Sequence, residues 1–271
     1  AFIHGNWALC NSLPNGDWCG VNEELTVLRE TGCYADFTFP AVPSPAQPKQ
    51  ANNIYYAVDT AGRPRGHDRG IEAKVTEERK NGTTEEPNNR TMEPRDATAE
   101  TGQRRNTWDA AKTAGRPRPA ALYNTEHGTA RPRGLLLVQG PLALNWRWRK
   151  WGLLPRIEHA ALDGSNPPTA QRADLWVRQH VHVRGRPEWI FVKVHTHGCL
   201  ERNTDVLLGR PMADLHRTLT TQYNDGRQFC LHYVTAREMA NIIHAAEAGC
   251  EGNPGNYRDF FYQPPPVKRS C

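Results

Sequence analysis

The sequence predicts an α/β fold with a mostly parallel sheet and a long irregular insertion. In the second half of the chain, apolar runs of strand length alternate with stretches of helical period, which is typical of βαβ units. The 271 residues are 38% hydrophobic and 23% charged, which is enough to bury a core. From about Thr76 to Arg133, Gly, Pro, Asn, Thr, Arg and Glu dominate. We therefore expect a single domain over residues 1–271, with a low-complexity insertion at about 76–133.

The first quarter of the chain predicts short strands and one helix. The strands are expected at Phe2–His4, Cys33–Phe39 and Ile54–Val58. The helix is expected over Glu23–Thr31, because Asn22 is a suitable N-cap and Gly32 can end it in the left-handed conformation. Two Glu residues in its first turn favour the same start.

Strands and helices alternate in the second half. The strands are expected at Leu135–Gly140, Trp189–His195 and Cys230–Val234. The helices are expected from Thr169 to about Val181, from about Pro211 to Tyr223, and from Thr235 to the residue before Gly249. Thr169 caps the first of them, and Thr235 with Glu238 forms a capping box at the start of the last. The tail after Asn253 is expected to be extended and bound to the surface.

Composition and charge exclude several classes of protein. There is no run of eighteen apolar residues, so no membrane-spanning helix is expected. The net charge of +5 comes mostly from dispersed Arg, and only Asn145–Trp151 combines basic with aromatic residues, so nucleic-acid binding is not expected. Seven scattered cysteines without a C-x-x-C pair favour reduced thiols and a cytoplasmic protein. The common nucleotide-binding and serine-hydrolase motifs are absent from the sequence.

Two histidines at the end of the predicted strand Trp189–His195 are the first candidates for chemistry. His195 and His197 are two residues apart, so they share a face if the strand continues to His197. The carboxyl end of a parallel strand is where α/β folds place ligands and catalytic groups. A His-x-His pair can hold a divalent metal, or one histidine can act as general acid or base. The alternative is a hydrogen-bonded core role for His195 and a loop position for His197.

The predicted N-terminal strands supply further candidates. His4 follows a short apolar stretch and precedes Gly5, which makes it a candidate third metal ligand. Asn6 can orient a substrate hydroxyl or an imidazole. Asp36 is a carboxylate in an otherwise apolar strand, so it is either a base or ligand near the histidines or the partner of an Arg.

Asn145 and Trp146 follow the apolar strand Leu135–Gly140 and are candidates for lining a carbohydrate groove. An aromatic face packs against a sugar ring, and amides form hydrogen bonds with its hydroxyl groups. The alternative is that Trp146, Trp148 and Trp151 pack as core or form a cation–π surface.

Six blocks of sequence together resemble a known family. They are FIHGNWALCNS, WCGVNEELTVLRETGCYADFTFP, NNIYYAVD, LLLVQGPLALNW, FVKVHTHG and LHYVTAREMANIIHAAEAG. In these blocks the chain is similar to bacterial proteins of the polysaccharide deacetylase-like group in the glycoside hydrolase/deacetylase superfamily. The resemblance covers nearly the whole chain apart from the insertion. The superfamily's paired-Asp and H-[ST]-x-x-H motifs are absent, and we expect their counterparts upstream of Ala1 in a longer chain. Its R-P-P-x-G motif is absent too.

The resemblance implies a distorted (β/α) barrel and metal-dependent hydrolysis of an N-acetyl or O-acetyl group. In that chemistry an ion held by one Asp and two His activates water, a carboxylate acts as base, and a late-strand His protonates the leaving group. FVKVHTHG resembles that late strand, which implies His195 or, as the second choice, His197. FIHGNW resembles a strand end that faces substrate or metal. Relatives carry an Asp where this chain has Cys10.

The expected function is removal of acetyl groups from a bacterial surface polysaccharide or related glycan, with Zn²⁺ as the metal. The expected site residues are His195 and Asp36 for catalysis, His4 and His197 for the metal, and Asn6, Trp7, Asn145 and Trp146 for the acetylated glycan substrate. The alternative is a catalytically inactive glycan-binding scaffold of the same fold. Glycoside hydrolysis is not favoured, because no pair of acidic residues at strand ends stands out.

Overall fold

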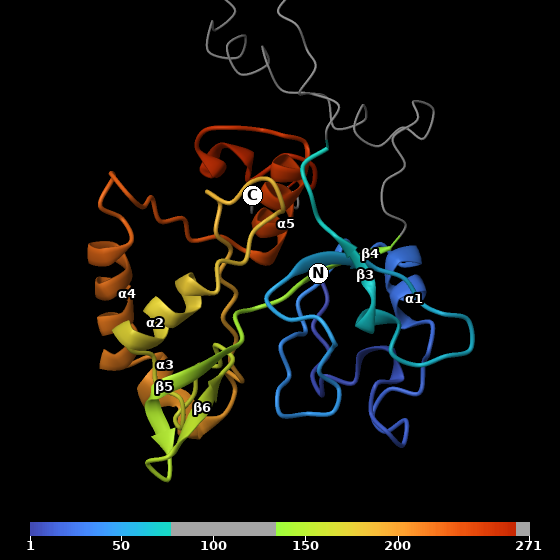
Figure 1. Ribbon diagram of the computed structural model, residues 1–271, viewed down its shortest axis with the longest axis horizontal. Helices are drawn as coiled ribbons and strands as arrows, with labels where there is room; N and C mark the ends of the chain where they lie inside the picture. The colour runs from blue at the N-terminus through green and yellow to red at the C-terminus, as the bar shows by residue number, and fades with distance from the viewer. Residues whose placement is uncertain (77–133, 264–271) are drawn as a thin grey trace, which may run out of the picture. The chain divides into compact units, whose positions relative to one another are not determined.

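The structure is a computed structural model that describes residues 1–76 and 134–263 (Figure 1). The chain divides into two units, one made of Ala1–Val75 with Ala130–Cys271 and the other of Thr76–Thr129. Apart from Thr76, the insertion predicted at about 76–133 lies outside the described residues. All of the helices and strands described belong to the first unit.

The larger sheet has four strands in the order β1-β4-β2-β3. They are β1 (Ala35–Asp36), β2 (Ile54–Ala57), β3 (Gly70–Glu72) and β4 (Leu135–Val138). β1 and β4 are parallel, whereas β2 is antiparallel to both of its neighbours, β4 and β3. All four residues of β4 are buried, as expected for a strand with a neighbour on each side.

The predicted distorted (β/α) barrel with a mostly parallel sheet is wrong. The sheet is mixed and its strand order is linear, so it does not close on itself. A barrel of this type needs successive strands that run in one direction and are joined by crossover helices. β2 runs against β4, and the predicted strand Trp189–His195 joins neither of the two sheets described.

Two predicted strands are extended segments without a ladder. They are Trp189–His195 and Cys230–Val234. In the first, Phe191 N donates to Val181 O at 2.8 Å, whereas His195 N donates to Ala160 O at 3.2 Å. The backbone thus bonds to two different neighbours in turn, and no strand runs beside it for long enough to form a sheet.

The predicted helices are present, with ends close to those expected. They are α1 (Glu24–Glu30), α2 (Ala170–Arg178), α4 (Arg210–Gln222) and α5 (Ala236–Glu247). Thr169 caps α2, and Thr235 with Glu238 forms the predicted capping box of α5. Asn22 does not cap α1, because Glu23 holds the N-cap position and makes no side-chain cap bond.

Short helical turns complete the described chain. They are η1 (Leu9–Asn11), η2 (Gly66–Asp68), η5 (Glu201–Asn203), α3 (Thr204–Leu207) and η6 (Pro254–Tyr257). The predicted N-terminal strand is reduced to a single bridge between Phe2 and Asp36. The described part of the tail, residues 254–263, is not extended as predicted: it forms η6 and is held by Asn241 of α5, whose Nδ2 donates to Tyr262 O at 2.8 Å. The rest of the tail lies outside the described residues.

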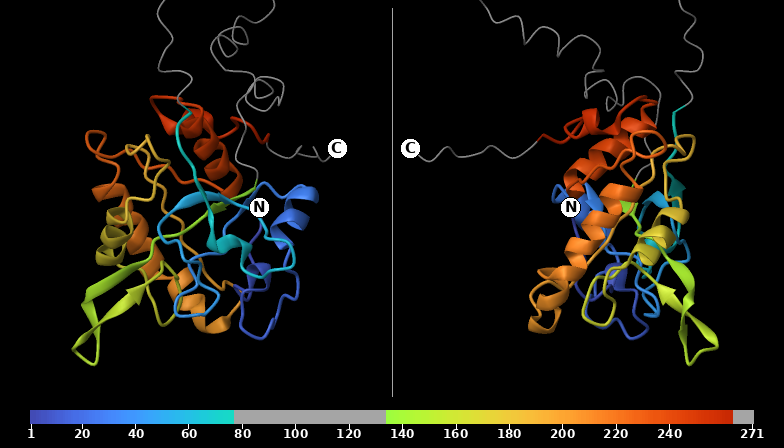
Figure 2. Two further views of the ribbon diagram at one scale, coloured as in Figure 1. Left: turned by 45° about the vertical axis from the view of Figure 1, so that its right-hand side comes forward. Right: turned by 90° about the vertical axis from the view of Figure 1, so that its left-hand side faces the viewer.

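A separate antiparallel hairpin consists of β5 (Ala143–Lys150) and β6 (Leu154–Glu158). Its register shifts between Asn145 and Arg149, which marks a bulge in β5. In both views of Figure 2 the turn of the hairpin extends past the neighbouring segments. At its base, Glu158 Oε2 accepts a hydrogen bond from Arg172 Nε of α2 at 2.7 Å, and both side chains are buried.

Among the described residues, buried apolar side chains form two clusters around these elements. The first joins η1, α1 and the four-stranded sheet through Leu9, Cys10, Leu25, Phe39, Ala41, Tyr55, Ala57, Leu135 and Leu137. The second joins the segment after β6 to α2 and α4 through Ala160, Leu162, Ala173, Trp176 and Leu215. Within the described ranges, no helix is both long and apolar enough to cross a membrane.

Candidate metal centre

Three side chains of metal-binding type meet beside the first turn of α1. His4, Cys19 and Glu24 each offer one ligand atom, and these atoms all lie within 4.8 Å of one another. His4 Nε2 is 4.0 Å from Glu24 Oε1, and the two side chains are 11% and 15% exposed. The group is therefore partly buried and remains within reach of solvent.

The thiol of Cys19 lies among donors that suit a thiolate. Its Sγ accepts hydrogen bonds from the backbone amides of Asn11 at 3.3 Å and Val21 at 3.5 Å, and it donates to Glu24 Oε2 at 3.2 Å. Burial raises the pKa of Cys19, so the thiol keeps its proton without a cation nearby. A divalent ion reverses that preference, because the thiolate is the form that binds a metal.

The turn η1 holds Glu24 in place. Cys10 adopts a left-handed conformation with φ of 53°, and its backbone N donates to Glu24 Oε2 at 2.7 Å. The carbonyl oxygen of Cys10 accepts a hydrogen bond from Arg65 N at 2.7 Å. A non-glycine residue in this conformation is strained, so these contacts must stabilise it.

The thiol of Cys10 faces a second carboxylate. Its Sγ donates to Asp59 Oδ1 at 3.7 Å, and Asp59 Oδ2 accepts from the backbone N of Thr26 in α1 at 2.7 Å. Burial, with the charge of Asp59 as the next cause, raises the pKa of Cys10 far above its usual range. Cys10 is thus a neutral thiol and not a nucleophile.

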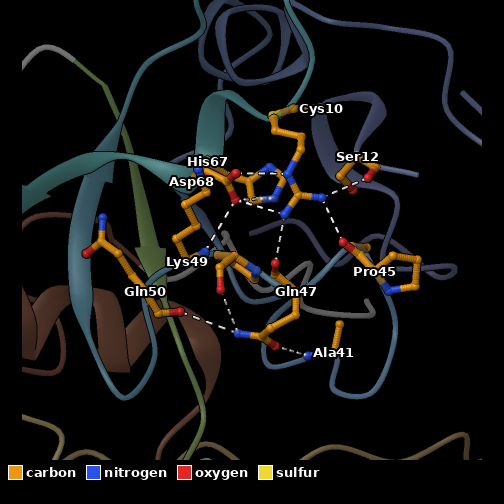
Figure 3. A network of polar contacts seen from close by, with 12 residues as sticks. Cys10, Ser12, Ala41, Pro45, Gln47, Lys49, Gln50, His67 and Asp68 are labelled. Carbon is orange, nitrogen blue, oxygen red and sulfur yellow. Dashed lines mark hydrogen bonds and ion pairs between the residues drawn. The ribbon is translucent and has the colours of Figure 1, made fainter. Parts of the chain in front are cut away.

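A polar network around Arg65 connects loops of the N-terminal segment (Figure 3). The guanidinium of Arg65 donates to the carbonyl oxygens of Ser12 at 2.8 Å, Pro45 at 2.7 Å and Gln47 at 2.8 Å. It also forms an ion pair with Asp68, with 2.8 Å between Nε and Oδ2. One side chain therefore joins η2 to two separate loops of the N-terminal segment.

Asp36 lies beneath His4 and not beside His195. It is 1% exposed, and its Oδ2 accepts from Thr38 Oγ1 at 2.7 Å. The same hydroxyl oxygen accepts from the backbone N of His4 at 2.8 Å. Burial raises the pKa of Asp36 to about 6, against the hydrogen bonds from Thr38 and the charge of Lys193. In this arrangement Asp36 positions the backbone of His4.

The structure places His195 and His197 in different surroundings. The ring of His195 stacks on that of His159, with centroids 5.7 Å apart, and its buried Nδ1 has no hydrogen-bond partner among the described residues. Burial lowers the pKa of His195 to about 3. His197 is exposed and meets the ring of Trp7 edge-on at 6.0 Å. Neither histidine belongs to the ligand group formed by His4.

The predicted substrate residues fall in two places. Asn6 donates its backbone N to His4 Nδ1 at 3.3 Å, so it lies beside the ligand group, and Trp7 N donates to His4 O at 3.0 Å. Asn145 and Trp146 instead line a pocket of about 180 Å³ against α2. Its lining comprises Leu144, Asn145, Trp146, Arg147, Gln171, Asp174, Leu175 and Arg178.

The role of Asn145 in that pocket is partly structural. Its Oδ1 accepts from Arg147 N at 3.2 Å and from Trp148 N at 3.1 Å, which stabilises the bulge of β5. Its side chain is buried, whereas Trp146, which also lines the pocket, is 58% exposed.

Sequence reasoning missed Cys19 and Glu24. Glu24 was accounted for as an acidic residue in the first turn of a helix, which is a common stabilising position. Cys19 has no second cysteine at a metal-binding spacing. Only the folding of the loop between η1 and α1 brings both to His4.

Comparison of the chain with known protein families, with curated proteins and with solved structures finds no match.

Proposed function

We propose that this chain is a Zn²⁺-dependent hydrolase whose ion is held by His4, Cys19 and Glu24. The observation that carries the proposal is the convergence of an imidazole, a thiol and a carboxylate within 4.8 Å. This donor set suits Zn²⁺, which binds nitrogen, sulfur and oxygen ligands in tetrahedral geometry. Three protein ligands leave a fourth position for water, as in catalytic zinc sites.

The surrounding hydrogen bonds support a metal role for Cys19 and Glu24. Backbone amides from Asn11 and Val21 reach the Cys19 sulfur, and such outer contacts orient a ligand and stabilise the thiolate. Glu24 Oε2 is fixed by Cys10 N, while Glu24 Oε1 faces His4. When bound, the ion supplies a Lewis acid and lowers the pKa of a bound water.

Proton release accompanies metal uptake at this site. The Cys19 thiol donates to Glu24 Oε2, so a bound ion displaces that proton. His4 Nδ1 accepts from Asn6 N, which places the proton of the neutral ring on Nε2, the atom nearest Glu24. Binding through Nε2 would require the imidazole proton to move to Nδ1, which breaks the hydrogen bond from Asn6 N. The Cys19 proton is released to solvent, so metal affinity falls as pH decreases.

The substrate class is an acetylated glycan, and this part of the proposal rests on the family resemblance. The metal set differs from the one that the resemblance implies, because Cys19 and Glu24 replace His197. Asp36 supports His4 through Thr38, so we assign it a positioning role. His195 is not assigned a role in this proposal, because burial keeps its ring neutral and it lies outside the ligand group.

Metal analysis of the full chain tests the proposal. After dialysis against Zn²⁺ and then metal-free buffer, about one zinc per chain is expected by mass spectrometry. Cys19→Ser and Glu24→Gln should each lose most of it, whereas Cys33→Ser, which changes a half-buried thiol outside the group, should retain it. Unchanged zinc in the first two variants would overturn the metal site.

Acetate release separates catalysis from metal binding. With an acetylated oligosaccharide, the zinc-loaded chain should release acetate, and this activity should disappear with a chelator and in Cys19→Ser. Bound zinc without acetate release would leave the metal site standing and exclude the hydrolase. Circular dichroism of each variant checks that loss of zinc does not reflect loss of the fold.

A second candidate is glycan binding without catalysis, which the pocket beside α2 favours. Trp146 offers an aromatic face, while Gln171 and Asp174 offer groups that bond sugar hydroxyls. Trp146→Ala should abolish binding to an immobilised acetylated glycan, whereas Trp18→Ala, at another exposed tryptophan, should not. Equal binding by the two variants would exclude this pocket.

A further inference from the structure

The turn end of the β5–β6 hairpin exposes an unusual amount of apolar surface. Trp151 is 77% exposed, Leu153 is 78% exposed and Leu154 is 56% exposed. The three residues lie within or beside the turn, which is the lowest part of the ribbon in Figure 1. We call residues 147–156 the hairpin tip. Apolar side chains gathered at one exposed end indicate an interaction surface.

The hairpin tip is also strongly basic. Its cations are Arg147, Arg149, Lys150 and Arg156, and the segment contains no acidic residue. None of these four takes part in an ion pair within the described part of the chain. Lys150 Nζ lies 4.5 Å from the ring centre of Trp151, and Arg156 lies 4.1 Å from that of Trp148. These cation–π contacts order the side chains and leave their positive charge in place.

The base of the hairpin holds the tip on a fixed stem. Glu158 accepts from Arg172 through both carboxylate oxygens at 2.7 Å, and it also accepts from Trp176 Nε1 at 2.9 Å. The paired strands then extend from α2 to the turn, as Figure 2 shows. A docking surface on such a stem needs little ordering when it binds.

We propose that the hairpin tip docks onto the surface of an anionic phospholipid bilayer. Tryptophan favours the boundary between headgroups and acyl chains, and leucine gains free energy by entering the apolar layer. The four cations complement acidic headgroups at the depth where those residues insert. The hairpin tip lies at the surface and does not span the bilayer.

The exposed leucines favour a bilayer over a single-stranded nucleic acid. A nucleic acid would use the basic groups and stack its bases on Trp151. Leu153 and Leu154 have no role in that recognition, and a nucleic acid would leave them in water. A bilayer accounts for both the charge and the apolar residues.

Co-sedimentation of the full chain with lipid vesicles tests this proposal. The chain should pellet with phosphatidylcholine vesicles that contain phosphatidylserine, and less with phosphatidylcholine alone. Replacing Arg147, Arg149 and Lys150 by Gln should lower the partition coefficient by roughly 100-fold, given the contribution of each cation near an anionic surface. Binding should also fall as salt concentration rises.

The apolar residues need their own variant and matched controls. Trp151→Ser with Leu153→Ser and Leu154→Ser should abolish the binding that persists at high salt. Leu208→Ser is the control for the loss of an exposed leucine. The replacement of Arg210, Arg217 and Arg227 by Gln is the control for an equal loss of charge. Both control variants should bind the vesicles as the wild type does. Equal binding by wild type and tip variants would overturn the proposal. So would tip-dependent binding to a single-stranded oligonucleotide without vesicle binding, or tip-dependent self-association.

Discussion

His67 is a neutral histidine sealed in the core. It is 0% exposed and stacks on Phe39, with ring centroids 4.9 Å apart. Neither ring nitrogen makes a hydrogen bond to the described residues, and the nearest carboxylate oxygen, Asp68 Oδ1, is 3.8 Å from Nε2. Burial lowers the pKa of His67 to about 4 from 6.5. The stability linked to this group is therefore present above pH 6.5 and is lost as pH falls through 4.

Replacing His67 by Phe should remove this part of the acid sensitivity. Between pH 7.5 and 4.5, the unfolding free energy of the wild type should fall by roughly 2.5 kcal/mol more than that of His67→Phe. Urea unfolding at both pH values measures the difference. If the unfolding free energy of the two proteins falls by the same amount, protonation of His67 does not destabilise the folded state, and the prediction is wrong.

Asp36 should act on stability with the opposite sign. Burial raises its pKa to about 6 from 3.8, so its contribution is present at low pH and is lost as pH rises through 6. An asparagine side chain cannot take up the proton. When pH is lowered from 7.5 to 4.5, the unfolding free energy of Asp36→Asn should therefore fall by about 2 kcal/mol more than that of the wild type. The same urea titrations give the result. A shift in the direction expected for His67→Phe would contradict the assignment.

For single residues, the sequence predicted which side chains need a partner more accurately than it predicted which partner each has. Asp36 was singled out because a carboxylate in an apolar strand needs a partner. The structure supplies Thr38, two residues away, and the charge of Lys193. Cys19 and Glu24 carried no local signal, because a ligand set is defined by distances in the fold and not by spacing in the chain.

Among the elements, α5 has the clearest local signal for its start. Thr235 Oγ1 accepts from Glu238 N at 3.3 Å, and Glu238 Oε2 accepts from Thr235 N at 2.7 Å. Thr235→Ala removes one of these bonds and should cost about 1 kcal/mol of unfolding free energy. Thr220→Ala, at an exposed position in α4, should cost little, because alanine is the better helix former. Thermal unfolding of both variants checks the prediction, which fails if they lose equal stability.

Helices were predicted more accurately than strands for a physical reason. A helix satisfies its backbone within one segment, so caps such as Thr169 and Thr235 are visible in the sequence. A strand needs a neighbour, and within the described chain the apolar run Trp189–His195 pairs only through an isolated bridge between His195 and Ala161 and a single bond from Phe191 N to Val181 O. Trp189 and Phe191 are buried all the same, at 5% and 7% exposed, whereas Val194 is 42% exposed. The apolar pattern thus predicted the burial of part of this segment correctly, and the strand pairing wrongly.

At the scale of the whole molecule, Lys193 connects that extended segment to the N-terminal sheet. It is 8% exposed, and its Nζ donates to Phe37 O at 2.6 Å and Phe39 O at 2.5 Å. Gly140 allows the close approach, because a Cβ there would lie 2.7 Å from Lys193 O. Such contacts join residues more than 150 positions apart. No periodicity in the sequence reports them. The barrel was expected from the alternation of strands and helices and from the family resemblance, neither of which specifies that β2 runs against β4.

A double-mutant cycle on Lys193 and Asp36 tests whether this connection is electrostatic as well as steric. Lys193→Met leaves two buried carbonyl oxygens without this donor and removes the positive charge that lowers the pKa of Asp36. It should therefore cost about 3 to 5 kcal/mol of unfolding free energy at pH 7.5. Adding Asp36→Asn removes the uncompensated charge, and the double variant should recover at least about 1 kcal/mol. Urea unfolding of the four proteins gives the coupling. Additive losses would show that Lys193 stabilises the junction through its hydrogen bonds to Phe37 and Phe39 alone, whereas recovery would show that the charge of Asp36 selects a cation at this position.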